Sequence, residues 1–228
     1  MPSLDRDGQV FVLNLGDGEN RFNADSVAAL GALLDEVEKA AGPKALVTCA
    51  TGKTWSLGLD LDWIRDNAAG VVPFIGSVQA LLARVLVMPV PTVAALQGHT
   101  FAAGAMLALA HDFRVMRSDR GFFCLPEVDI NIPFSAGMSA LIQAKLTHRA
   151  AHESMATGRR YGGTDALSEG IVHEAVSEDE VLEAAVARAR GLASKDGATL
   201  GTIKRTMYAR QHQSLLDLNP EGLGVLLS

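Results

Sequence analysis

The chain has 228 residues, 48% of them hydrophobic and 20% charged, which is enough for one sizeable hydrophobic core. Its 26 acidic and 20 basic residues leave a formal net charge of −6, which argues against a nucleic-acid protein held by a broad basic surface. Cys49 and Cys124 lie in apolar runs without metal-ligand spacing, so we expect two buried thiols, no disulfide framework and no metal centre.

The first half of the chain alternates short apolar runs, which predict strands, with segments whose apolar residues recur at helical spacing. Asn23 is placed to cap the first helix, and Gly42-Pro43 to stop it. In chain order we expect a strand at 10–15, a helix over 27–37, a strand at 45–50, a loop at 51–58, a short segment near 61–64, a helix over 74–85, a strand at 92–96 and a loop at 98–103.

The second half is predicted to be mainly helical. We expect a buried helix at 104–110, strands at 113–116 and 122–125, helices at 135–146, 149–157, 178–193 and about 198–211, and a strand at 171–176 between the second and third of these helices. Alternating strands and helices followed mostly by helix predict an α/β fold with a helical C-terminal part.

Nothing in the sequence predicts a targeting or membrane-spanning segment. Residues 3–8 are polar where a signal peptide needs an apolar core, and the final Leu226-Leu227-Ser228 is not a peroxisomal signal. The apolar stretch 101–110 is too short to span a membrane, and the stretch 74–96 is interrupted by polar residues and prolines. We therefore expect a cytoplasmic protein with no membrane or nucleic-acid partner.

Several common site motifs are incomplete. Gly52-Lys53-Thr54 follows a strand, as the end of a P-loop would, but Val47 replaces the first glycine of that motif. No G-x-G-x-x-G follows a strand and no G-x-S-x-G is present, which removes the usual support for Rossmann and α/β-hydrolase proteins. His148 and His152 have metal-ligand spacing but lack the glutamate of H-E-x-x-H, so solvated histidines are the favoured interpretation.

Three other segments carry residues suited to chemistry. The first is the turn 53–61, KTWSLGLDL, and the second is 97–106, QGHTFAAGAM, where small residues mark the start of a helix. Small side chains there let a ligand approach unpaired N–H groups at the positive end of the helix dipole. The third, 125–129, places Glu127 among apolar residues, which raises a glutamate pKa toward the range useful for proton transfer. Each segment alone is also compatible with ordinary packing.

Taken together and in this order, the three segments resemble the crotonase family, also called enoyl-CoA hydratase/isomerase. The resemblance extends from about residue 10 to 207 and includes the turn 20–23, NRFN, and the buried unit 94–112. The stretches 111–116, HDFRVM, and 127–130, EVDI, are similar to the Δ3,Δ2-enoyl-CoA isomerase branch.

The resemblance implies an α/β, crotonase-like spiral of ββα units with a helical C-terminal region. Residues 1–195 would form the spiral core with the acyl-CoA site, and residues 196–228 the helical region with trimer and CoA contacts. A homotrimer or a dimer of trimers is the implied assembly. No cofactor is implied beyond the coenzyme A that is part of the substrate.

The resemblance also implies a site for an acyl-CoA thioester. Matching the motifs places two backbone N–H donors for the thioester oxygen at Leu57 and Ala103, with Glu127 as the proton carrier. Met106 stands where hydratases of the family have a second glutamate, and a methionine can neither accept nor donate a proton. One carboxylate is sufficient to take a proton from C2 and return it to C4, so a Δ3,Δ2-enoyl-CoA isomerase is expected.

Further residues are expected around the substrate. The substrate-binding candidates are Trp55, Ser56, Gly58, Leu59, Asp60, Leu61, Phe101, Met106 and Phe134, although core packing explains the aromatic ones and Leu61 equally well. Arg21, Lys53 and Lys204 are candidate contacts for CoA phosphates, with solvated surface charge as the default interpretation. Asp129 is a candidate second acid, and Asn131 is expected to be structural because asparagine tolerates positive φ.

Two alternatives stay open. An enoyl-CoA hydratase, or another crotonase reaction through an enolate, would use Glu127 with a second group that the sequence does not identify. A non-catalytic acyl-CoA-binding subunit would keep the binding site without turnover.

Overall fold

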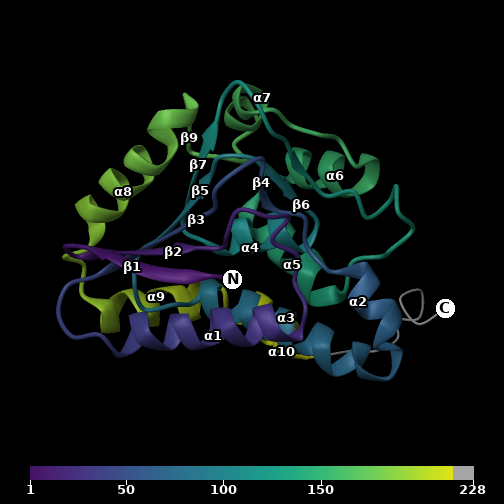
Figure 1. Cartoon of the computed structure of the whole chain (residues 1–228), viewed down its shortest axis with the longest axis horizontal. Helices are drawn as coiled ribbons and strands as arrows, with labels where there is room; N and C mark the ends of the chain where they lie inside the picture. The colour runs from purple at the N-terminus through teal and green to yellow at the C-terminus, as the bar shows by residue number, and fades with distance from the viewer. Residues whose placement is uncertain (218–228) are drawn as a thin grey trace.

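The computed structural model describes residues 1–217, in which two sheets are surrounded by helices (Figure 1). The antiparallel hairpin β1–β2 begins the larger sheet, and every other pairing between described strands of the two sheets is parallel. The larger sheet has the order β1 (Ser3–Asp7), β2 (Val10–Asn14), β3 (Ala45–Cys49), β5 (Thr92–Leu96), β7 (Phe113–Arg117) and β9 (Glu174–Val176). The smaller sheet has the order β4 (Thr54–Ser56), β6 (His99–Phe101) and β8 (Phe123–Cys124).

The chain follows the same path three times. A strand of the larger sheet leads to a strand of the smaller sheet and then to helix: β3–β4 is followed by α2 (Leu61–Asp66) and α3 (Val71–Leu86), β5–β6 by α4 (Ala103–Ala110), and β7–β8 by α5 (Ala136–Lys145). Parallel neighbours need such crossovers, because a tight hairpin joins only antiparallel strands. The predicted spiral of ββα units is confirmed.

The central strands of the larger sheet are buried on both faces. Because side chains alternate along a strand, Val47 and Val93 face α8 (Val181–Leu192), where Ala185 and Ala189 are small enough for close packing. Residues of the opposite face, such as Leu46, join the main core with α1 (Ala24–Lys39), α3 and α4. Figure 1 shows α8 and α1 on opposite sides of these strands. The continuous apolar runs of the sequence follow from this double burial.

Polar side chains cap the starts of several helices. Asn23 caps α1 as predicted: its Oδ1 accepts from Ser26 N at 2.9 Å, and Ser26 Oγ accepts from Asn23 N at 2.9 Å. Ser135 caps α5 in the same way, accepting from Met138 N at 3.2 Å. Helix α4 differs, because Ala102 precedes it without a side-chain cap while all eight of its residues are buried. Within residues 1–217, no side chain caps its first N–H groups.

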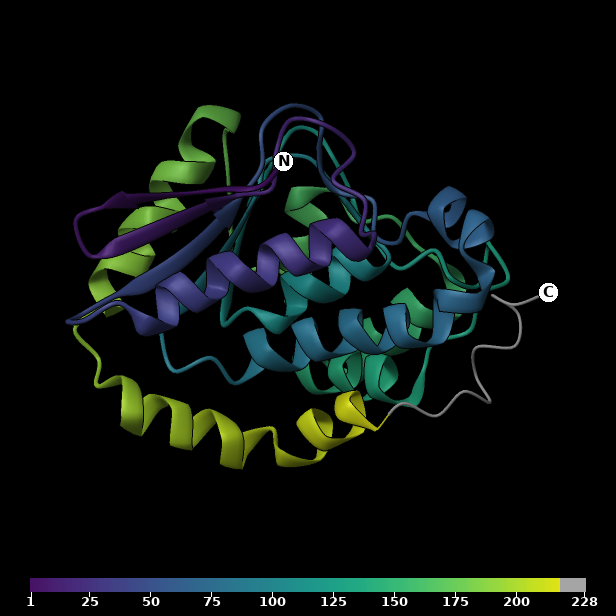
Figure 2. The ribbon, with the colours of Figure 1, turned by 60° about the horizontal axis from the view of Figure 1, so that its bottom comes forward.

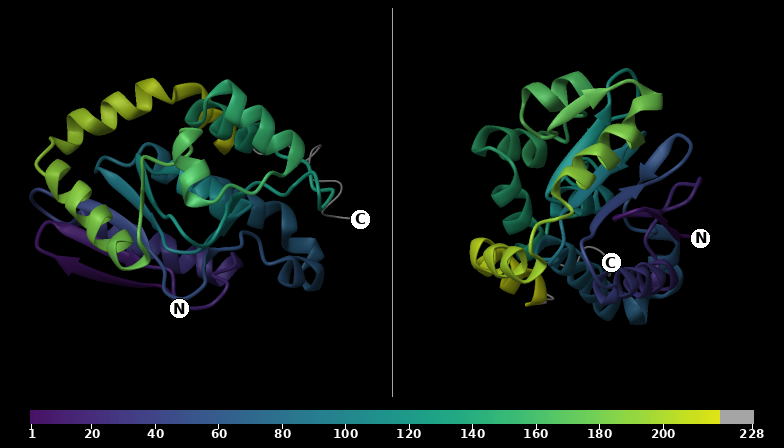
Figure 3. Two further views of the ribbon diagram at one scale, coloured as in Figure 1. Left: turned by 90° about the horizontal axis from the view of Figure 1, so that it is seen from above. Right: turned by 90° about the vertical axis from the view of Figure 1, so that its left-hand side faces the viewer.

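The C-terminal part contains two helices where the sequence predicts one over 198–211. Helix α9 (Gly197–Met207) ends at Tyr208 and α10 (Ala209–Leu216) continues in a new direction (Figure 2, Figure 3). Helix α10 packs against α3 and α5, and an added Cβ at Gly137 would lie 2.5 Å from Ser214 O. The described part of the predicted 196–228 region thus packs on the chain's own core, and residues 218–228 lie outside the described part.

Some short elements were not predicted. The expected loops 51–58 and 98–103 contain β4 and β6, whose three residues each are too few to show a side-chain alternation. Strand β1 lacks an apolar run because it lies at an exposed sheet edge. Helix α7 (Gly163–Ser168) was missed, α6 (His148–Thr157) was predicted, and the strand predicted over 171–176 is shortened to β9.

One helical stretch within residues 1–217, Ala68–Leu86, is long and apolar enough to cross a membrane by length and composition. It joins a 3₁₀ turn (Ala68–Gly70) to α3, and more than half of it is buried inside the protein. Because α3 packs against α1, α4 and α10, its apolar surface is used by the core of the domain.

Candidate active site

An apolar cavity of about 270 Å³ opens where β6 turns into α4. Its wall is formed by the turn after β4, the first turn of α4, the loop 126–134, and residues of α3 and α5. Of the residues predicted from the sequence, the cavity is lined by Arg21, Leu57, Leu59, Leu61, Phe101, Ala103, Met106, Glu127 and Phe134. Segments far apart in the sequence therefore meet at one site, as predicted.

One predicted oxyanion donor is already engaged. Leu57 N donates to Glu19 O at 3.0 Å, so this N–H is not available to a substrate. Phe22 and Leu59 form a parallel bridge, in which Phe22 N donates to Gly58 O at 2.7 Å and Asp60 N donates to Phe22 O at 2.9 Å. In such a parallel bridge the intervening residue directs its own N–H to the opposite side. The available N–H on this turn is therefore that of Leu59, and the prediction of Leu57 is corrected to Leu59.

The turn carrying Leu59 lies directly against the start of α4. Gly58 has φ +83°, and a Cβ added there would lie 2.8 Å from Ala103 N. A Cβ added at Gly104 already approaches Ser56 to 2.7 Å. Because both contacts are too close for a larger residue, glycine at 58 and 104 is what allows the two segments to meet. The sequence signal for this contact is a glycine in each of the two segments, within S-L-G and A-A-G-A.

Ala103 is the first residue of α4, and its N–H makes no hydrogen bond within the described chain. The residue before it, Ala102, has φ +51° and ψ −128°, a backbone conformation that L-residues rarely adopt and that costs about 1–3 kcal/mol. Hydrogen bonds on both sides hold Ala102 in place: its N donates to Cys124 O and its O accepts from Met106 N, both at 3.0 Å. The strain is thus located beside the free N–H of Ala103.

Glu127 is the single carboxylate among the described residues that line the cavity. Its side chain is 6% exposed, and Oε2 has no hydrogen-bond partner within residues 1–217. Burial raises the pKa of Glu127 to about 7, although a backbone hydrogen bond acts in the opposite direction. The predicted raised pKa is supported, and the group is balanced between its charged and neutral forms near neutral pH.

Met106 lines the same cavity one turn into α4 and is almost fully buried. Its position leaves no second acid beside Glu127 on this wall. Asp129, the candidate second acid, is exposed and does not line the cavity; its carboxylate lies against Gly158, where an added Cβ would be 2.4 Å from Oδ2. Asn131 has φ +57°, which agrees with its predicted structural role.

Four predicted substrate contacts lie outside the cavity lining: Trp55, Ser56, Gly58 and Asp60. Trp55 is fully buried in the core, where its Nε1 donates to Thr48 O at 3.3 Å. Ser56 Oγ donates to Asn20 O at 2.8 Å and accepts from Gly58 N at 3.2 Å. Asp60 caps α2 by accepting from Trp63 N at 3.1 Å. These side chains shape the turn that carries Leu59, and Gly58 acts through its backbone.

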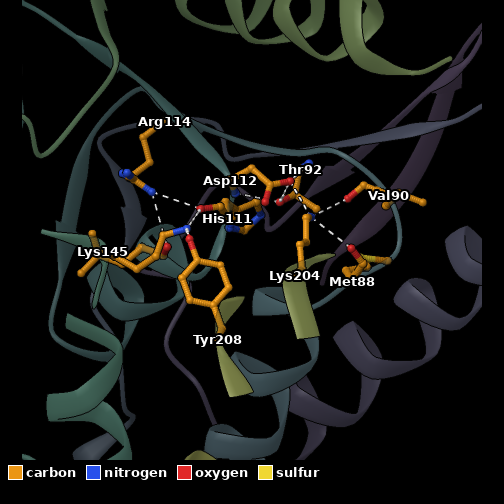
Figure 4. A network of polar contacts seen from close by, with 10 residues as sticks. Met88, Val90, Thr92, His111, Asp112, Arg114, Lys145, Lys204 and Tyr208 are labelled. Carbon is orange, nitrogen blue, oxygen red and sulfur yellow. Dashed lines mark hydrogen bonds and ion pairs between the residues drawn. The ribbon is translucent and has the colours of Figure 1, made fainter. Parts of the chain in front are cut away.

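The three predicted phosphate contacts have different surroundings. Arg21 lines the cavity and pairs with Glu19 at 2.6 Å on a partly exposed surface. Lys53 is exposed and outside the cavity lining. Lys204 is 4% exposed, and its Nζ donates to Asp112 at 2.6 Å, Val90 O at 2.9 Å and Met88 O at 3.0 Å (Figure 4). The prediction for Lys204 is wrong, because its ammonium is used to join α9 to the core.

The network in Figure 4 also fixes the far end of α4. Arg114 Nη1 donates to His111 O at 3.1 Å and to the carbonyls of Ala108 and Leu109 at 3.4 Å, and Lys145 Nζ donates to His111 O at 2.9 Å. Both cations meet the negative end of the helix dipole. Burial lowers the pKa of Lys145 to about 7 and that of Arg114 to about 10. Helix α4 is thus anchored at its C-terminus and open at its N-terminus.

Within the part of the chain that the structure describes, no three His, Cys, Asp or Glu side chains gather in a way that could hold a metal ion. The described residues of the cavity supply one buried carboxyl, that of Glu127, and the unpaired backbone N–H of Ala103.

The fold and the cavity define a class: a crotonase-type α/β protein with one buried carboxyl in a cavity beside backbone N–H groups that have no partner in the described chain. The sequence model of the enoyl-CoA hydratase/isomerase family matches residues 6–218, and the chain belongs to this family. Its enzyme class and its fold were both predicted from the sequence.

Named relatives extend this assignment. The chain is 36% identical over 219 residues to "Enoyl-CoA delta isomerase 3" of Arabidopsis thaliana, covering 91% of this chain and 92% of that protein. It is 37% identical over 221 residues to "Enoyl-CoA delta isomerase 2, peroxisomal" of the same organism, with the same coverage. The fold is similar to that of human mitochondrial delta3-delta2-enoyl-CoA isomerase, with a TM-score of 0.88 at 23% identity over 99% of this chain and 90% of that chain.

The corrected role of Lys204 predicts a stability defect. Lys204→Met removes the cation that pairs with the Asp112 carboxylate, which keeps only its hydrogen bonds from Thr92, and it removes the donor to two carbonyls. We therefore expect a loss of about 3 kcal/mol in urea unfolding. Lys195→Met, at an exposed position, is the control and should change stability by less than about 0.5 kcal/mol. The KM for an acyl-CoA substrate should be unchanged in both variants. A raised KM with unchanged stability would restore the phosphate-contact interpretation.

Proposed function

We propose that the protein is a Δ3,Δ2-enoyl-CoA isomerase, which moves a double bond from C3 to C2 of an acyl-CoA thioester. The observation that carries the proposal is the single buried carboxyl of Glu127 in the cavity that also contains Leu59, Ala103 and the apolar Met106. The names of the two Arabidopsis relatives support the same activity.

The first step is capture of the thioester. Its carbonyl oxygen accepts hydrogen bonds from the N–H groups of Leu59 and Ala103, the second of which carries the positive end of the α4 dipole. These donors bind the developing oxyanion more strongly than the neutral carbonyl. From oxyanion holes in general, each contributes about 3 kcal/mol of transition-state stabilisation.

The second step is a proton shuttle by one side chain. Ionised Glu127 takes a proton from C2, and the electron pair of that C–H bond delocalises into the thioester to give a dienolate. Protonated Glu127 then returns the proton to C4, the C3–C4 double bond becomes single, and the new double bond joins C2 and C3. A pKa of about 7 suits both steps, because the carboxyl is neither strongly basic nor strongly acidic at neutral pH.

Met106 distinguishes this reaction from hydration. Adding water requires one group to hold and deprotonate the water while another delivers a proton to carbon. Apart from Glu127, the described polar side chains on the cavity wall are Arg21 and Ser135, and neither is a carboxylate. The hydratase alternative therefore has no visible second acid, and a binding subunit would not need the raised pKa of Glu127.

Other parts of the proposal follow from the family resemblance. Arg21 lines the cavity and is proposed to contact a phosphate of the acyl-CoA substrate. The role of Lys53 stays a prediction. The homotrimer or dimer of trimers, the cytoplasmic location and the absence of a further cofactor also stay predictions.

Glu127→Gln tests the proton carrier. The amide cannot accept the C2 proton, so we expect kcat for 3-hexenoyl-CoA to fall by about 10²- to 10⁴-fold, measured as formation of 2-hexenoyl-CoA. The variant should fold, because a neutral amide avoids burying the ionised carboxyl that the wild type carries above pH 7. Undiminished isomerisation in this variant would rule out the shuttle. Conversion of 2-hexenoyl-CoA to a 3-hydroxyacyl product by the wild type would favour the hydratase.

The pKa of Glu127 predicts the pH dependence. The free enzyme must hold Glu127 ionised, so kcat/KM should rise about tenfold per pH unit below pH 7 and become level above it. Folding stability should change in the opposite direction: the carboxyl binds its proton more tightly when folded, so stability is full below pH 4.5 and falls as the pH rises to about 7. Both trends should be absent from Glu127→Gln, and a midpoint near 4.5 would show that burial does not control the group.

A further inference from the structure

Phe134 borders the active-site cavity and two further hollows at the protein surface. It lines the cavity together with Glu127. Both residues also line a second hollow of about 540 Å³, which Ser139 and Met155 help to form. Phe134 and Met155 line a third hollow of about 420 Å³, between α5 and α6. Phe134 is the one described residue that these three spaces share.

The three spaces follow one another along α5. Ser135 lines the cavity, Ser139 the second hollow and Gln143 the third. Residues four apart lie on the same face of a helix, so the three spaces occupy one face over about 12 Å of α5. Met155 of α6 supplies an apolar side chain to both outer hollows. Together the spaces form a row that begins at the cavity and passes Phe134.

The inner end of the cavity is closed. Ile75 of α3, Met106 of α4 and Met138 of α5 line it, and each is at most 7% exposed. All three side chains belong to the main hydrophobic core. A ligand that outgrows the cavity therefore finds its next apolar surface in the row along α5, beyond Phe134.

The backbone on both sides of Phe134 is held by hydrogen bonds. Ser135 follows it as the cap of α5 and donates from Oγ to Gln79 Oε1 of α3 at 2.8 Å. Before it, Ile132 N donates to Glu127 O at 3.0 Å and closes the loop that carries both Glu127 and Phe134. Because one short loop carries the two residues, the ring of Phe134 has a fixed place relative to the carboxyl.

We propose that Phe134 determines the length of the acyl chain that the site accepts, and that the substrate is a medium-chain enoyl-CoA. The inference rests on the proposed acyl-CoA function of the cavity. A space of about 270 Å³ holds about nine groups of the size of a water molecule or a methylene, at roughly 30 Å³ each. A chain of six to about eight carbons therefore fits in front of the ring, and one of twelve does not.

The selection follows from packing. Each methylene of a short chain is removed from water by the cavity wall, which favours its binding. A longer chain must displace the half-buried ring of Phe134, which packs against the core, or leave its end in water. With alanine at position 134, the ring is gone and the chain end can enter the hollows beside Met155.

The test compares 3-hexenoyl-CoA with 3-dodecenoyl-CoA. We expect the kcat/KM of the wild type to be at least ~10-fold higher for the C6 substrate. Phe134→Ala should raise the C12-to-C6 ratio at least ~10-fold, and Phe134→Leu, which removes less of the side chain, should give an intermediate ratio. Phe122→Ala is the matched control, because Phe122 is 39% exposed and lines none of the three spaces; it should keep the wild-type ratio.

A double variant tests the path of the chain end. Met155→Asp places a carboxylate in both outer hollows, where an alkyl chain would bury it at a cost. Added to Phe134→Ala, it should return the C12-to-C6 ratio to within about threefold of the wild-type value. A gain that persists in the folded double variant would show that the chain does not use the row along α5, and would overturn the proposed path.

Binding separates this proposal from the isomerase assignment. Dissociation constants of hexanoyl-CoA and dodecanoyl-CoA, measured by calorimetry, should show the same change of preference between wild type and Phe134→Ala without turnover. That change without any isomerisation would support the role of Phe134 and contradict the proposed activity. Isomerisation with equal kcat/KM for both chain lengths in the wild type would overturn the role of Phe134, and so would unchanged ratios in Phe134→Ala and Phe134→Leu proteins that urea unfolding shows to be folded.

Discussion

The free N–H of Ala103 is the feature on which the site depends. It belongs to the first turn of a fully buried helix that begins without a side-chain cap. At the other end of α4, Arg114 and Lys145 bind the last carbonyls, so the polar groups there are satisfied inside the protein. The N–H groups at the N-terminus of this buried helix are unpaired, and leaving them unpaired costs folding free energy. In the proposed reaction, the same N–H groups and the positive end of the helix dipole stabilise the oxyanion.

Other residues around this N–H also have features that cost folding free energy. Ala102 holds a positive φ that alanine disfavours, and Glu127 keeps a carboxyl oxygen unpaired and buried. Gly58 and Gly104 permit the close contact that brings Leu59 to the same place. Each of these features opposes folding slightly, and together they produce a preorganised apolar cavity in which a single carboxyl changes its charge near neutral pH.

The sequence predicts the architecture well because the strands and helices of the spiral have long apolar patterns, as in β3, β5 and α3. It predicts that Glu127, Ala103 and Met106 share one site, because their segments resemble a family, and all three line the cavity. Their catalytic roles stay predictions. It fails at Leu57, since which N–H of a turn is free depends on pairing with Phe22 and Glu19, more than 30 residues away. It fails at Lys204 for a similar reason: its partners, Asp112 and the carbonyls of Met88 and Val90, are brought to it only by the fold.

The path of the proton tests the central claim most directly. 3-Hexenoyl-CoA with deuterium at C2 can be isomerised in ordinary water and the product examined by nuclear magnetic resonance at C4. If Glu127 alone carries the proton and is shielded from solvent, the 2-enoyl product contains deuterium at C4. Turnover with only solvent hydrogen at C4 would contradict the account, because it would require the proton to leave Glu127 or a second acid to supply another.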